Sequence, residues 1–110
     1  MLYILNSPII TSYGIYTYKR ISKEDAISLL KNNQFVSAVG HEPTAQFLST
    51  LFQIPIPMNR VTISMQTGDQ AIVFKLLDRL PEGRVLSLEE LKSIRYEIGL
   101  LVKEDEENEE

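Results

Sequence analysis

The sequence predicts a single α/β domain, and its element pattern and its composition lead to that prediction. Short apolar runs typical of strands alternate along the chain with stretches whose apolar residues recur at helical spacing. The 110 residues are 44% hydrophobic and 24% charged, which is ordinary for one globular domain. The chain has no cysteine, which excludes a disulfide framework and thiol catalysis. We expect residues 1–103 to form a mixed sheet of about five to six strands with about three helices.

The N-terminal part predicts two strands and a helix. Residues 2–5 are apolar and are followed by turn-forming residues, and residues 15–21 alternate in polarity, so both are expected to be strands. Ser22 is followed three residues later by an acid, which is close to a capping box. This pattern predicts a helix that ends around residues 32–33.

A third strand and a second helix follow. Residues 35–39 are an apolar run that predicts a buried strand. Pro43 fits the first turn of a helix because that position needs no backbone N–H. Leu48, Leu51 and Phe52 form its apolar stripe, and the prolines at 55 and 57 are expected to end it.

The second half predicts a hairpin, a helix and a last strand. Residues 61–65 alternate in polarity and residues 71–77 are mostly apolar, with a turn between them, so we expect the two to pair as a hairpin. The capping box that begins at Ser87 predicts a helix to about Tyr96. Residues 98–102 are expected to complete the sheet.

The net charge of −4 is unevenly distributed. Six of the fifteen acidic residues lie in the last seven positions, and residues 104–110 are therefore expected to be a disordered acidic tail. The remaining body carries nine acids against eleven Lys and Arg. This mildly basic body suits a small polyanion, but it lacks the dense basic stripe expected of a duplex-binding protein.

No membrane partner is expected. The first residues lack the basic region and the long apolar stretch of a signal peptide, and no segment approaches the ~18 apolar residues of a membrane span. We expect a cytoplasmic protein. No cofactor is expected.

The one histidine, His41, lies where the third predicted strand meets the second predicted helix. Open α/β sheets place ligands at such junctions. Exposed N–H groups of a helix N-terminus attract a phosphate, and an imidazole beside them can move a proton. The alternative is a histidine that caps the helix or packs in the core.

Other kinds of chemistry lack their residues. We see no ligand spacing for a metal, no nucleophile elbow and no phosphate-binding loop of the P-loop type. What remains is acid–base chemistry by His41 with arginines that hold an anion. Those groups suffice for RNA cleavage by its own 2′-hydroxyl, in which the substrate supplies the nucleophile.

Four segments together resemble a known family. They are Leu5-Asn6-Ser7, Gly40-His41-Glu42-Pro43-Thr44, Met58-Asn59-Arg60-Val61 and Arg79-Leu80-Pro81-Glu82-Gly83. In this order and at these separations they resemble the ring nucleases that archaeal viruses and phages use as type III anti-CRISPR proteins. The resemblance covers residues 1–103. It implies a homodimer that binds cyclic tetra-adenylate and, without metal, cuts it into linear di-adenylates, which switches off type III CRISPR signalling.

The resemblance also implies roles for individual residues. His41 is then the general acid, Arg79 the arginine near the scissile phosphate, and Glu82 the acid that orients Arg79. Arg60 would bind the ligand, and the polar residues that line its pocket would be Asn6, Ser7 and Thr44.

Two other functions remain open on the sequence alone. A sponge would bind the cyclic nucleotide without cutting it, although a binder has no need of His41. A small viral nucleic-acid-binding regulator would bind duplexes in a salt-dependent way, which the mildly basic body supports poorly.

Overall fold

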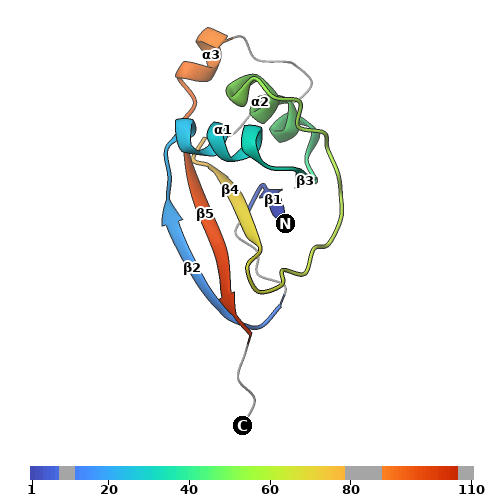
Figure 1. Ribbon diagram of the computed structural model, residues 1–110. Helices are drawn as coiled ribbons and strands as arrows, with labels where there is room; N and C mark the ends of the chain where they lie inside the picture. The colour runs from blue at the N-terminus through green and yellow to red at the C-terminus, as the bar shows by residue number, and fades with distance from the viewer. Residues whose placement is uncertain (8–11, 79–87, 107–110) are drawn as a thin grey trace.

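The computed structural model describes residues 1–7, 12–78 and 88–106, which form a five-stranded mixed sheet with helices α1 and α2 packed on one of its faces (Figure 1). The strands are β1 (Leu2–Leu5), β2 (Ile15–Arg20), β3 (Phe35–Ala38), β4 (Gln70–Leu76) and β5 (Tyr96–Asp105), in the order β2-β5-β4-β1-β3. The helices are α1 (Lys23–Asn32), α2 (Glu42–Phe52) and α3 (Leu88–Lys92). The predicted fold class is confirmed. Within these residues no helix is long and apolar enough to cross a membrane.

Three neighbouring strands run in parallel. Leu5 of β1 pairs with Ala38 of β3 on one side and with Val73 of β4 on the other, both in parallel register. Strand β5 is antiparallel to both β4 and β2. The carboxyl ends of β1, β3 and β4 therefore point to the same edge of the sheet, which is where ligands bind in open α/β sheets.

Helix α1 begins and ends as the sequence predicts. The Ser22 hydroxyl accepts a hydrogen bond from the Asp25 backbone N–H at 3.0 Å, which satisfies one of the free donors of the first turn. At the other end, the Asn33 side chain donates to the Leu29 carbonyl at 2.9 Å. Ala26 and Leu30 then face the sheet and are buried.

The two faces of the sheet carry separate apolar clusters. The larger lies under α1 and α2, where Phe47 of α2 packs against Phe74 of β4 with ring centroids 5.3 Å apart. The smaller lies on the other face and contains Val73 and Leu101 with Met65 from the chain that precedes β4. Among the described residues, those of this second cluster come from strands and loops and none from a helix.

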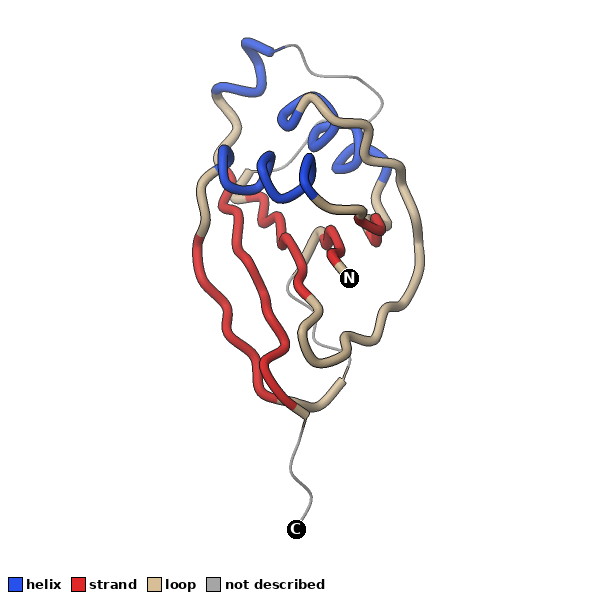
Figure 2. Tube along the Cα trace, viewed as in Figure 1, coloured by secondary structure: helices blue, strands red, loops and turns tan. Residues whose placement is uncertain are grey.

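The prediction of a strand at residues 61–65, paired as a hairpin with 71–77, is wrong. Both edges of β4 are already occupied, by β1 and β5, so no edge remains for a hairpin partner. The chain between α2 and β4 has no regular secondary structure and runs beside the sheet (Figure 2). Its Ile56 packs on the helix side, whereas Ile63 and Met65 pack on the other face. The alternation of residues 61–65 thus reflects two side chains that cover the sheet.

The C-terminal elements also differ from the prediction. Helix α3 ends at Lys92 rather than near Tyr96, because Tyr96 begins β5 opposite Leu76 and packs on Phe74. Strand β5 extends to Asp105 and so continues into the segment expected to be a tail. Residues 107–110 lie outside the described part of the chain.

Candidate functional site

The N-terminus of α2 follows directly from the carboxyl end of β3. His41 occupies the N-cap position, with extended backbone angles and a carbonyl that accepts from the Ala45 N–H at 3.0 Å. Its imidazole makes no capping hydrogen bond, and Pro43 lies in the first turn as predicted. The first-turn amides of Glu42 and Thr44 are therefore not capped by the N-cap side chain, which leaves them available to an anion.

The imidazole of His41 is instead held from one side. Its Nδ1 lies 2.7 Å from the Oγ1 of Thr44, three residues along the same helix turn. Thr44 is buried, whereas His41 is exposed. A threonine fixed in the core thus orients a histidine at the surface, and Nε2 is the ring nitrogen left to meet a ligand.

Arg60 lies beside the residue that precedes His41. Its Nε donates to the Gly40 carbonyl at 2.9 Å, and its side chain is otherwise exposed. A guanidinium has five N–H donors, of which this bond uses one. The remaining donors suit a phosphate or carboxylate next to the helix N-terminus. The structure therefore brings together three of the predicted residues, His41, Thr44 and Arg60.

Asn6 and Ser7 follow β1 directly. Because Leu5 is in parallel register with Ala38, these two residues leave the sheet at the same edge as Gly40 and His41. Asn6 is exposed and Ser7 is half-buried. Their predicted place at this edge agrees with the topology.

Arg79 and Glu82 lie outside the described residues, so their predicted roles stay predictions. Asp78, the residue before Arg79, is held tightly. It accepts the Arg95 backbone N–H at 2.7 Å and the Arg95 Nη2 at 2.8 Å. These hydrogen bonds and the charge of Arg95 lower the pKa of the Asp78 carboxyl, and the pKa of Arg95 is raised in turn.

Sequence reasoning gave no role to Asn59, although it lies in one of the four segments. Its backbone N–H donates to the Val39 carbonyl at 2.8 Å and its side-chain amide donates to the Ser37 carbonyl at 2.7 Å. These bonds fasten the residue before Arg60 to the open edge of β3. The signal in the sequence that could have indicated a role for Asn59 is its position directly before the candidate ligand-binding residue Arg60.

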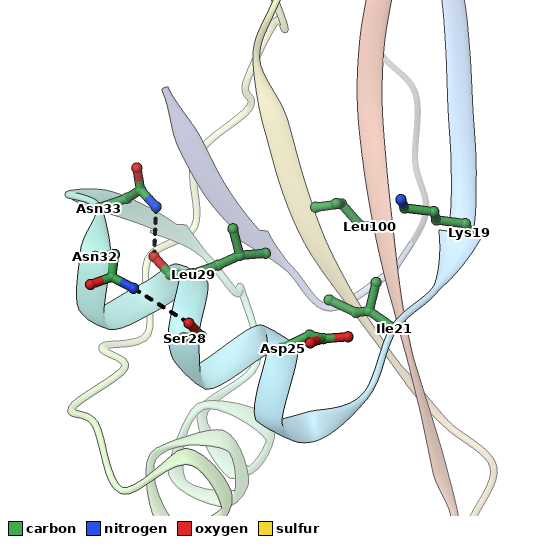
Figure 3. A pocket seen from close by; sticks show the side chains of 8 residues that line it. All are labelled: Lys19, Ile21, Asp25, Ser28, Leu29, Asn32, Asn33 and Leu100. Carbon is green, nitrogen blue, oxygen red and sulfur yellow. Dashed lines mark hydrogen bonds between the residues drawn. The ribbon is translucent and has the colours of Figure 1, made fainter.

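The described residues also line pockets elsewhere. The one in Figure 3, of about 330 Å³, lies between α1 and the strands β2 and β5 and combines charged, amide and apolar side chains. Its lining includes Lys19, Asp25, Ser28 and Leu29. The Asn32 amide donates there to the Ser28 hydroxyl at 3.3 Å. None of the predicted site residues in the described part of the chain lines this pocket.

The side chains of residues 1–7, 12–78 and 88–106 include no group of three or more histidines and carboxylates that could hold a metal ion. The chemistry available at the helix N-terminus is therefore that of an imidazole, a guanidinium and backbone amides. Together they can bind an anion and transfer a proton.

The chain is similar to proteins of archaeal viruses and of a bacterium. The sequence profile of the STIV B116-like family matches residues 2–98. Uncharacterized protein 26 of Sulfolobus islandicus filamentous virus is 44% identical, over 91% of this chain and 89% of its own. Uncharacterized protein YddF of Bacillus subtilis is 37% identical, over 92% of this chain and 95% of its own.

A solved structure has the same fold. B116 of Sulfolobus turreted icosahedral virus superimposes with a TM-score of 0.80 at 25% identity and covers 92% of this chain and 97% of its own. The family match spans most of the chain, and both of these relatives exceed one third identity over most of their length. The chain therefore belongs to the STIV B116-like family.

Proposed function

We propose that the protein is a metal-independent ring nuclease that cleaves cyclic tetra-adenylate into linear di-adenylates with 2′,3′-cyclic phosphate ends. Such an activity would remove the second messenger of type III CRISPR defence from the cytoplasm. The activity comes from the sequence resemblance, and the local geometry supports it.

The observation that carries the proposal is the pairing of His41 with Thr44 at an uncapped helix N-terminus. A histidine kept for packing would be buried, and one kept for capping would bond a first-turn amide. His41 does neither, because its side chain is exposed and its Nδ1 is bound to a buried hydroxyl. This arrangement fixes the orientation of a proton donor next to an anion site.

The proposed step moves two protons, forms one bond to phosphorus and breaks another. The ligand's 2′-oxygen loses its proton to solvent and attacks the adjacent phosphorus, and the bond from phosphorus to the 5′-oxygen breaks. In the imidazolium form of His41, Nδ1 donates to Thr44 Oγ1 and Nε2 delivers its proton to the departing 5′-oxygen. Arg60 and the amides of the first turn bind the charged oxygens.

The same proposal includes a homodimer. A ring of four phosphates has a near two-fold axis, and a symmetric dimer would present His41 and Arg60 twice to it. Light scattering at micromolar protein tests this part, with twice the monomer mass of 12.6 kDa expected. A monomer with full activity would contradict it.

The function is tested by incubating the protein with cyclic tri-, tetra- and hexa-adenylate in a chelator and separating the products. We expect linear di-adenylates from the tetra-adenylate ring. Recovery of intact ring that remains bound to the protein would identify a sponge instead. Absence of both binding and cleavage would refute the proposed function.

A further inference from the structure

We propose that Asn59 is a positioning residue that holds Arg60 ready to receive a phosphate. The consequence for ligand binding rests on the proposed function. The positioning itself is a property of the free protein, and it can be measured without any ligand.

The residues around Asn59 are fastened to β3 by three hydrogen bonds. The Asn59 backbone N–H and side-chain amide donate to the Val39 and Ser37 carbonyls, at 2.8 and 2.7 Å. The buried Ser37 in turn donates from its hydroxyl to the Pro57 carbonyl at 2.6 Å. β3 is the outermost strand of the sheet that the described residues form, so these bonds satisfy backbone groups on its unpaired side.

The segment that these bonds anchor places the Arg60 side chain against Gly40. A Cβ added at Gly40 would lie 3.1 Å from Arg60 Cγ, closer than most such contacts, so the absence of a side chain there lets the arginine stem approach. The Arg60 Nε then reaches the Gly40 carbonyl at 2.9 Å. The guanidinium is thereby fixed next to the residue that carries the imidazole.

Fixing an arginine in advance favours binding. A free arginine side chain loses rotamer entropy when a ligand immobilises it, and this loss opposes binding. In this protein the Asn59 amide fixes the backbone, and the Gly40 carbonyl fixes the Nε, before any ligand arrives. Removal of the Asn59 amide should therefore weaken ligand binding through Arg60 alone.

The first measurement follows the Nε–Hε group of Arg60 by nuclear magnetic resonance in the free protein. We expect backbone-like order in the parent protein and lost order in Asn59→Ala. The matched control is Asn32→Ala, which removes an amide that bonds Ser28 on α1, and which should leave Arg60 unchanged. An Arg60 signal that stays ordered in Asn59→Ala would overturn the proposal.

If Asn59→Ala fails to fold, Asn59→Asp replaces it. That variant keeps the size of the side chain but turns a donor into an acceptor opposite the Ser37 carbonyl. The order of Arg60 should be lost here as well, and its retention would again overturn the proposal.

The second measurement is a double-mutant cycle with cyclic tetra-adenylate as the ligand. Asn59→Ala should weaken binding by about tenfold, with turnover at saturation nearly unchanged, because Arg60 binds ground and transition states alike. In an Arg60→Ala background the same change should have no further effect. Equal losses in both backgrounds would show a general structural role instead. A parent protein that does not bind this ring refutes the proposed function, whereas the order of Arg60 still decides the positioning role.

Discussion

Thr44 holds the ring of His41 by a 2.7 Å contact between Oγ1 and Nδ1, and of these two neighbouring residues the threonine is buried and the histidine is exposed. The threonine is 4% exposed and belongs to the packed side of α2. The histidine precedes the first turn and is exposed. Helix packing thus sets the direction of the one imidazole in the chain.

Thr44→Val should slow turnover by ~10-fold with little effect on ligand affinity, because the lost hydroxyl is bonded to the imidazole, whereas the first-turn amide of this residue stays in place. Steady-state kinetics on cyclic tetra-adenylate would measure both quantities. The matched control is Thr50→Val in the same helix, which removes a hydroxyl that bonds the Gln46 carbonyl. An equal loss of turnover in both variants would contradict the orienting role.

Asp78→Asn should reduce turnover several-fold while the melting temperature moves little. The carboxylate binds both the backbone and the guanidinium of Arg95, and so fixes the chain directly before Arg79. Exposed ion pairs contribute little to global stability, so the effect should be local. Glu97→Gln removes a different exposed pair, with Arg20, and should leave turnover unchanged. Identical kinetics in the two variants would refute a role for Asp78.

Asp69→Asn should destabilise the fold by about 1–3 kcal/mol at neutral pH, since it breaks hydrogen bonds to a buried charge. Burial raises the pKa of Asp69, but the Gln66 amide, the terminal ammonium of Met1 and the charge of Lys103 outweigh it, so the pKa lies below its usual 3.8. A lowered pKa gives stability that is complete above pH 3.8 and is lost as the pH falls through the folded value.

Chemical denaturation from pH 2 to 7 would measure this dependence. The parent protein should lose stability below about pH 4, and Asp69→Asn should lose less over the same range. Asp25→Asn, at an exposed carboxylate on α1, is the control and should follow the parent protein. An unchanged acid slope in Asp69→Asn would show that other groups cause it.

Two truncations should distinguish what residues 104–106 and residues 107–110 contribute to stability. Deletion of 107–110 should leave the melting temperature unchanged. Deletion of 104–110 should lower it, because Asp105 pairs with Ile15 and because Glu106 bonds both the buried Lys103 at 3.0 Å and Thr67 at 2.9 Å. Equal melting temperatures for the two truncations would mean that these contacts add nothing.

Local signals in the sequence predicted most elements well. The Ser22 cap, the apolar runs of β1, β3 and β4, and Pro43 in the first turn of α2 each act within a few neighbouring residues. The position of His41 could be predicted from the same signals, because the end of β3 and the start of α2 are both determined by neighbouring residues.

The features that the sequence could not predict depend on contacts between residues far apart in the chain. The alternation at residues 61–65 is typical of a strand, but Ile63 and Met65 cover a sheet face whose central strand already has two partners. Asn59 contacts Ser37, 22 positions earlier, and no local pattern indicates that contact. The register that brings Asn6 to the same edge of the sheet as Gly40 likewise exists only after β1 and β3 pair.

The role of His41 as the proton donor in ring cleavage is tested most directly by the products formed from cyclic tetra-adenylate in a chelator. We expect ends with a 2′,3′-cyclic phosphate, no cleavage of a ring with 2′-deoxy sugars, and turnover slowed by ~10²–10⁴ in His41→Ala with most affinity retained. A 5′-phosphate product or cleavage of the deoxy ring would mean that water is the nucleophile, and undiminished turnover in His41→Ala would mean that His41 is not the proton donor.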